Sequence, residues 1–177
     1  VFADLASVAD ANAARLLVAP LMLVNSGLTN VLLPRLVLLR SEERYIEAEQ
    51  LAHRLMWMIA GIFVLYTALV VLADGRLTSL VLGDTYTGLE SFIVAWAAVN
   101  LLTALRGNTS ILLQVFKAFR TITLANIGSA VVVLILTWPL MYYYGVLGSI
   151  AAVALGEIIL VVLLRSGFAR VRRTYAG

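Results

Sequence analysis

The fold is most clearly indicated by residues 122–164, which read ITLANIGSAVVVLILTWPLMYYYGVLGSIAAVALGEIILVVLL. This stretch contains one charged residue, Glu157, and the Tyr-Gly pair at positions 144–145 divides it into the apolar runs 122–143 and 146–164. A helix rises about 1.5 Å per residue, so each run is long enough to cross the hydrocarbon core of a bilayer, about 30 Å thick. The stretch therefore predicts two membrane-spanning helices joined by a tight turn.

Three further apolar segments lie before this stretch, at residues 12–39, 55–73 and 92–116. The first contains Pro20, Gly27 and Pro34, so we expect this helix to be kinked or broken. A transmembrane β-barrel would instead need alternating segments of about ten residues. The prediction is an all-α fold, a single polytopic transmembrane bundle of about five spans over residues 1–177.

The composition agrees with a membrane protein and excludes several kinds of site. Of the 177 residues, 62% are hydrophobic and only 13% are charged, and the mean hydropathy is +0.98. Soluble domains are about half apolar and about a quarter charged, so lipid must be the solvent for much of this chain. The chain has no cysteine and one histidine, His53, which excludes disulfides, thiolate metal sites and histidine clusters. No cofactor and no metal are expected.

The connections between the apolar segments differ in kind. Residues 41–54 are rich in charge and predict a helical lead-in that lies in water or among lipid headgroups. Residues 117–121 and 142–145 are too short for anything but tight turns, which make neighbouring helices antiparallel. The longest link, 74–90, is expected to carry a short interfacial helix at 77–82.

Basic residues indicate the orientation, because cytoplasmic loops of membrane proteins are enriched in Lys and Arg. If five helices alternate in direction, Arg76 is the one basic residue on the far side. The near side receives Arg35, Arg40, Arg44, Arg54, Lys117, Arg120, Arg165, Arg170, Arg172 and Arg173. This bias predicts a multi-pass protein with a cytoplasmic C-terminus.

Polar residues recur at helical spacing in three of the apolar segments. In segment 92–116 the stripe runs through Asn100, Thr103, Arg106 or Gly107, Ser110 and Gln114. In segment 12–39 the polar residues are Asn12, Arg15, Ser26 and Asn30, and the run 122–143 adds Asn126, Ser129 and Thr137. Steps of three and four residues place side chains on one face of a helix. Such a face turns toward protein or water, not toward lipid.

Two interpretations of these polar faces stay open. They line a hydrated cavity, or they only form hydrogen bonds between helices. For the arginines we favour the cavity, because a charge inside a span is costly and marks a pathway. The predicted cavity-lining residues are Arg15, Asn30, Asn100, Arg106, Gln114 and Asn126.

Glu157 is the one acidic residue deep within a span. It could pair with an arginine, carry a coupling proton or contact headgroups, and pairing is the favoured role. Signatures of enzymes are missing from the sequence: it has no His or Cys metal-binding spacing, no GxSxG elbow and no phosphate-binding loop. We therefore expect a protein that is not an enzyme.

Four sequence motifs stand out along the chain: ARLLVAP at 14–20, LTNVLLPRL at 28–36, VLGDTY at 81–86 and YGVLGSIAAVALGE at 144–157. Together they resemble the polysaccharide flippases of the multidrug/oligosaccharidyl-lipid/polysaccharide exporter superfamily. Each motif is loose, but their order and spacing cover nearly the whole chain. The resemblance implies most of the C-terminal lobe of a MATE-like transporter, in which two six-helix lobes surround a central cavity.

The same resemblance implies a function and partners. Members of the family flip undecaprenyl-linked oligosaccharides across the bacterial inner membrane. In polysaccharide flippases the cavity is cationic, and Arg15 and Arg106 are the candidates for that charge here. The expected partners are the lipid-linked oligosaccharide, the bilayer and an N-terminal lobe, with no nucleic acid. The chain begins at Val1 without a Met, and we expect it to be part of a longer protein.

Three alternatives remain at this point. A multidrug/cation antiporter of the same superfamily would need membrane acids that bind the ion, and Glu157 alone is thin support. A membrane enzyme of glycan assembly would need a large outer loop with catalytic residues, whereas the link 74–90 is short. A purely structural subunit would not need polar faces on three helices.

Overall fold

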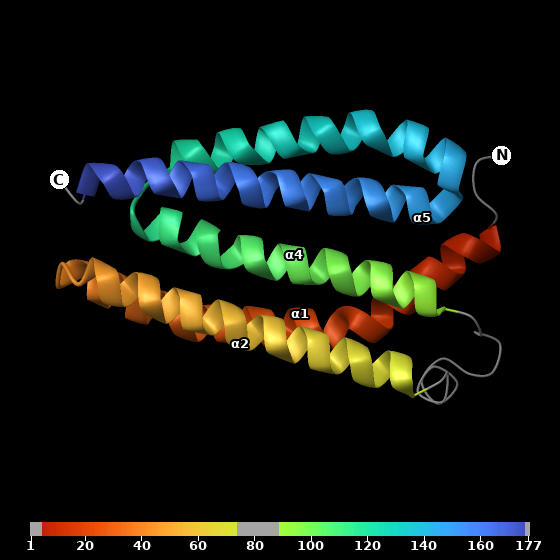
Figure 1. Cartoon of the computed structure of the whole chain (residues 1–177), viewed down its shortest axis with the longest axis horizontal. Coiled ribbons are helices and arrows are strands. Elements are labelled where there is room, and N and C mark those ends of the chain that lie inside the picture. The colour runs from red at the N-terminus through yellow and green to blue at the C-terminus, as the bar shows by residue number, and fades with distance from the viewer. Residues whose placement is uncertain (1–4, 74–88, 176–177) are drawn as a thin grey trace.

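The computed structural model describes residues 5–73 and 89–175, and every regular element among them is a helix. The helices are α1 (Leu5–Ser41), α2 (Tyr45–Leu72), α4 (Glu90–Val115) and α5 (Phe119–Tyr175). Figure 1 shows them lying roughly side by side along one long axis. The prediction of an all-α fold is confirmed for the described residues.

Among the residues that the structure describes, three helices are long and apolar enough to cross a membrane, fewer than the five spans expected: Ala6–Ser41, Tyr45–Leu72 and Phe119–Arg170. One reason is that the two runs 122–143 and 146–164 both belong to α5, which is one helical element with an interruption. The other is α4, which covers the segment 92–116 but is diluted by polar residues such as Asn100, Arg106 and Asn108.

Helix α5 folds back on itself at Gly145, as Figure 1 shows from the path of the chain. Gly145 has φ 60° and ψ −139°, a backbone conformation that residues with a Cβ rarely adopt. The residues before it, 119–144, form what we call the first leg, and the residues after it, 146–175, form the second leg. The turn predicted at 142–145 is therefore where the helical hairpin closes.

Small residues let the two legs of α5 approach closely. A Cβ at Gly156 would overlap with Cγ2 of Val133, and one at Gly167 would overlap with Cγ2 of Thr121. The hydroxyl of Ser129 donates a 2.7 Å hydrogen bond to the carbonyl of Gly156. This combination of glycine and a buried hydroxyl is typical of close helix contacts in membranes.

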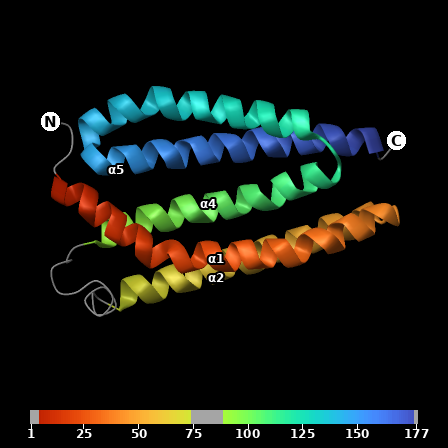
Figure 2. The same cartoon turned by 180° about the vertical axis from the view of Figure 1, so that it is seen from behind.

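The turns after α1 and after α4 are built alike. Glu43 and Lys117 have φ of 60° and 58°. At each turn the N–H groups of two consecutive residues bond back to carbonyls of the last helical turn, Glu43 to Arg40 and Arg44 to Leu39 in the first case. This is a Schellman motif, which satisfies carbonyls that a helix end would leave unpaired. Its compactness makes α1 and α2 antiparallel neighbours, and it likewise reverses the chain between α4 and the first leg, which runs antiparallel to α4 (Figure 2).

Charged residues surround the turn between α1 and α2. Arg44 forms ion pairs with Glu42 and Glu47 at 2.8 and 2.6 Å. Hydrogen bonds to Glu47 and then to Glu42 raise the pKa of Arg44. All three side chains are about half exposed, so the cluster adds little stability. The charged lead-in predicted at 41–54 is therefore this turn and the beginning of α2.

Helix α4 lies between the other elements and packs against α1, α2 and α5 (Figures 1 and 2). Prolines at positions 20 and 34 lie inside α1, which continues through both. Figure 2 shows that α1 bends in its N-terminal part. The predicted kink is present, and the predicted break is not, because neighbouring backbone hydrogen bonds hold the helix on both sides of each proline.

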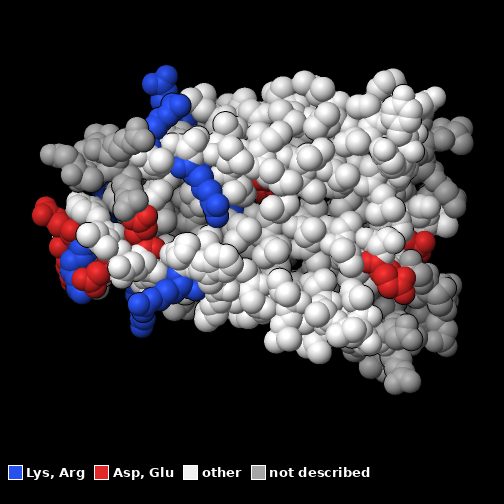
Figure 3. Space-filling view, in the orientation of Figure 1, with Lys and Arg blue, Asp and Glu red and all other residues white. Residues whose placement is uncertain are grey.

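Basic side chains gather at one end of the bundle. On the face in Figure 3, Lys and Arg lie toward the end that holds the turns after α1 and α4, and acidic side chains lie at that end as well. The link 74–88, with Arg76, the VLGDTY motif and the interfacial helix predicted at 77–82, lies outside the described residues. Which side of a membrane the basic end faces stays a prediction.

Gly145→Ala is expected to destabilise the protein by about 1–3 kcal/mol, because a Cβ at this φ and ψ strains the backbone. The matched control is Gly61→Ala, in α2, where an added Cβ meets nothing within 4 Å. Thermal unfolding in detergent measures both. A Gly145→Ala protein as stable as the control would contradict the hairpin turn.

Gly156→Val is expected to destabilise by about 1–3 kcal/mol, because it overpacks the contact between the legs of α5. Gly107→Val on α4 is the control, since the space around that glycine is open. The comparison of their unfolding temperatures tests the close contact, and equal losses would rule it out.

Candidate functional site

The site begins with an ion pair between two helices. Arg106 of α4 places Nε 3.0 Å from Oε2 of Glu157 on the second leg of α5. The two side chains are 27% and 16% exposed, and both atoms of the pair are buried. Neither atom makes a hydrogen bond within the part of the chain that the structure describes, because the N–H is not aimed at the oxygen. The pair is therefore held by charge and keeps unused hydrogen-bonding capacity.

Burial explains why these two charges lie together. A single charge in the middle of a membrane helix costs a few kcal/mol on insertion scales. Two opposite charges at 3.0 Å neutralise each other, so the pair adds no net charge to the two helices that carry it. Removal of one partner leaves the other buried and uncompensated, which costs about 3–5 kcal/mol in soluble proteins.

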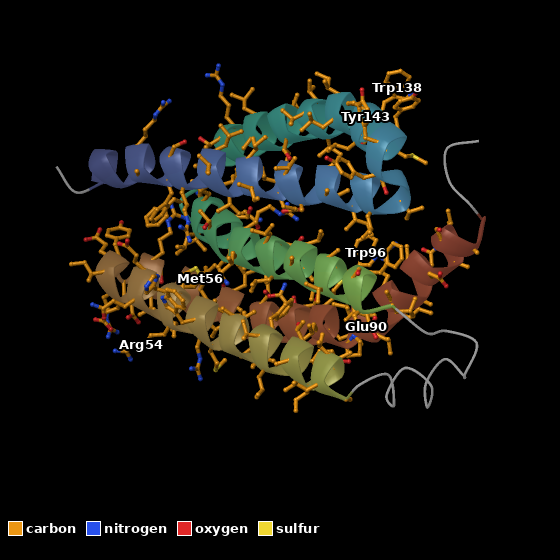
Figure 4. The ribbon with its side chains drawn as sticks, turned by 45° about the vertical axis from the view of Figure 1, so that its right-hand side comes forward. Arg54, Met56, Glu90, Trp96, Trp138 and Tyr143 are labelled. Atoms are coloured by element: carbon orange, nitrogen blue, oxygen red, sulfur yellow. The ribbon has the colours of Figure 1, made fainter. Side chains whose placement is uncertain are left out.

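Arg15 lies in a different place. Its guanidinium carbon is 5.4 Å from the centre of the Trp96 ring, within the range of a cation–π contact. Trp96 also donates a 3.0 Å hydrogen bond from Nε1 to the carbonyl of Ala11, which fixes the ring against α1. Figure 4 shows Trp96 between α4 and the N-terminal part of α1. The Arg15 side chain is exposed beside this platform.

The two arginines do not share one pocket. Ten residues of α4 separate Trp96 from Arg106, which corresponds to about 15 Å along a helix axis. Asn100 lies between them and is buried, 6% exposed. The arrangement is a row of polar groups along α4 rather than a single cluster.

Two of the four predicted amides bond within their own helices. Asn100 donates to the carbonyl of Trp96, and Asn126 donates to that of Ile122, each at 2.8 Å. Asn30 and Gln114 are exposed. Asn30 belongs to α1 and Asn126 to the first leg of α5, and these two elements lie on opposite sides of α4 (Figures 1 and 2). The structure thus brings Arg106 and Glu157 together, and it does not gather all the predicted residues around one cavity.

A polar cavity at the basic end was missed by the sequence analysis. Its volume is about 320 Å³, and residues of α2, α4 and the second leg of α5 line it. The lining residues are Glu49, Ala52, His53, Met56, Asn108, Thr109, Leu112, Arg165 and Phe168. Their spacing of three and four residues could have indicated one polar face on α2 and another on α4. It could not have indicated that these two faces meet.

The described residues do not bring three His, Asp or Glu side chains together as a metal site would need. The polar side chains along α4 form an ion pair and hydrogen bonds.

Arg106→Leu and Glu157→Leu are each expected to destabilise by about 3 kcal/mol, because each leaves one buried charge unpaired. The double replacement is expected to recover most of that loss, since two apolar side chains suit a lipid-facing bundle. Thermal unfolding of the two single variants and the double variant gives the coupling energy. Additive losses would show that the two charges do not interact.

Comparison with known proteins gives no counterpart for this fold or site. No family model matches the chain, and no curated protein and no solved structure matches it either. The resemblance to polysaccharide flippases therefore stays an interpretation of the sequence motifs.

Proposed function

We propose that the chain is part of a membrane transporter that flips lipid-linked oligosaccharides by alternating access. The observation that carries this proposal is the buried pair of Arg106 and Glu157 on two apolar helices. Ionisable groups inside membrane helices mark substrate or ion pathways, because their cost must be offset by a use. The unused hydrogen-bonding capacity of this pair supports a role in binding.

The substrate class follows from the charge of the groups along α4. A lipid-linked oligosaccharide carries an anionic diphosphate next to the lipid. Arg106 exchanges Glu157 for that diphosphate, while the lipid tail remains in the bilayer. Arg15, about 15 Å further along, offers the next cationic position. Two positions at different depths give the headgroup a stepwise route.

The transporter interpretation needs more helices than the three that are long and apolar enough by themselves. In this proposal α4 and each leg of α5 also cross the bilayer, which makes five crossings. The bundle then forms most of one MATE-like lobe and faces a second lobe across the pathway. Its basic end and C-terminus lie in the cytoplasm of a bacterial cell with the protein in the inner membrane.

Exchange of the two charges, Arg106→Glu with Glu157→Arg, tests the role of the ion pair in the full-length protein. The double variant keeps the pair, so its unfolding temperature is expected to return to near that of the parent. Surface polysaccharide is expected to fall by about tenfold or more, because the cation has moved to another helix and has lost a charge-assisted bond to phosphate.

The matched control is Arg35→Gln, which removes an exposed cation of α1. Full transport by the charge-exchanged protein would show that the pair is only structural and would contradict the proposal. Loss of drug resistance rather than surface polysaccharide would favour the antiporter alternative.

A further inference from the structure

We propose that the polar cavity lined by α2, α4 and the second leg of α5 binds an anionic membrane lipid whose headgroup carries hydroxyl groups, as that of phosphatidylglycerol does. Neither Arg106 nor Glu157 lines this cavity, so it is a site apart from their ion pair. Binding there needs a bilayer around the bundle and no transport activity. A loss of lipid binding and a loss of transport can therefore be measured separately.

One cation of the lining is available to an anion. Arg165 forms no ion pair with any described residue, and the contact of its Nη2 with Sδ of Met56 is 3.9 Å long. The thioether is a weak acceptor without charge, so the guanidinium keeps its positive charge and most of its N–H donors. Guanidinium groups bind phosphate oxygens through charge-assisted hydrogen bonds. A phosphodiester therefore matches this part of the cavity.

His53 supplies a second donor. Its Nε2 accepts a 2.9 Å hydrogen bond from Nε1 of Trp57, and the two rings meet edge to face. A neutral imidazole whose Nε2 accepts carries its proton on Nδ1, which makes that N–H a donor. His53 lines the same cavity as Arg165, so the two donors belong to one site.

Two buried residues of α4 supply acceptors for hydroxyl groups. Asn108 and Thr109 are 5% and 9% exposed, and both line the cavity. Oδ1 of Asn108 has no hydrogen-bond partner among the described residues, and a buried acceptor without a partner is costly. A ligand hydroxyl donates to such an oxygen. The glycerol of phosphatidylglycerol carries hydroxyl groups, whereas the choline of phosphatidylcholine has no O–H or N–H to donate.

The acidic residue of the lining does not favour an ammonium group. Glu49 lines the cavity but already has an interaction partner. It is the one acid among the lining residues, so they offer no uncommitted carboxylate to phosphatidylethanolamine. An available arginine beside an acid that is already engaged favours a headgroup with a net negative charge.

The location and size suit a lipid headgroup. The cavity lies toward the end where basic side chains gather, and basic pockets between membrane helices bind anionic headgroups (Figure 3). Trp57 beside it is 64% exposed, as expected for an aromatic ring at the membrane interface. The volume of about 320 Å³ is at the lower end for ligand sites and fits a single headgroup rather than an oligosaccharide.

The test compares lipids that differ in one chemical group. The purified full chain is placed in phosphatidylcholine nanodiscs, one other dioleoyl lipid is added at a time, and bound lipid is counted by native mass spectrometry. The probes are phosphatidylglycerol, phosphatidylethanol, which keeps the charged phosphodiester but has no hydroxyl, and phosphatidylethanolamine. Phosphatidylglycerol is expected to bind about fivefold more tightly than phosphatidylethanol, because one hydrogen bond is added. Phosphatidylethanolamine is expected to bind least.

Three variants assign these differences to the lining. Arg165→Gln is expected to weaken both anionic lipids by about tenfold, because a charge-assisted hydrogen bond is lost. Thr109→Val is expected to lower phosphatidylglycerol to the level of phosphatidylethanol and to leave phosphatidylethanol unchanged. The control is Arg120→Gln, which removes an exposed cation at the start of the first leg that does not line the cavity. It is expected to change neither.

Equal binding of phosphatidylglycerol and either other probe, or an equal loss in Arg120→Gln, would overturn the proposal. Displacement of the bound lipid by inorganic phosphate would also overturn it, because the cavity would then bind a free anion. Unfolding temperatures in phosphatidylcholine alone show which variants fold. The lipid series uses the unaltered protein, so it decides the question even where a variant does not fold.

Discussion

The structure depends on one constraint: a backbone in hydrocarbon cannot leave its N–H and carbonyl groups unpaired. Within a helix the backbone N–H and carbonyl groups pair with one another. Only those at the helix ends are left without a partner in the helix. The turns after α1 and α4 satisfy the last carbonyls with Schellman motifs at Glu43 and Lys117. The turn inside α5 uses the freedom of Gly145 to reverse the chain with almost no loss of helix. Because all three turns are compact, the helices that each turn joins run antiparallel, and α4 packs against α1, α2 and α5.

The same constraint explains the roles of the few polar groups inside the bundle. Ser129 satisfies a carbonyl across the two legs of α5, and Asn100 bonds to its own helix. These residues stabilise packing and need no ligand. Arg106 and Glu157 differ, because their contact satisfies the charge but not the hydrogen bonds. In the proposed transporter, a charged substrate that reaches this pair finds polar atoms already placed.

Hydropathy predicts much of the architecture but less of the site. The runs 122–143 and 146–164 and the turn between them are visible in the sequence, because a glycine after three tyrosines interrupts an otherwise apolar stretch. Periodicity also shows that Arg106 faces protein. It cannot show that Glu157 is its partner, because that depends on how far α4 is shifted along the second leg of α5. The cavity with His53, Asn108 and Arg165 was missed for the same reason, since three helices contribute to it.

The central claim is that α4 and each leg of α5 cross the membrane, so that the turns at Lys117 and Gly145 lie on opposite sides. The chain has no cysteine, so single cysteines can be introduced and labelled one at a time in intact cells. Glu43→Cys, Lys117→Cys and Tyr144→Cys are treated with a membrane-impermeant maleimide, before and after the membrane is made permeable. The account predicts that Tyr144→Cys reacts in intact cells, and that Glu43→Cys and Lys117→Cys react only after permeabilisation. Reaction of Lys117→Cys and Tyr144→Cys from the same side would contradict it.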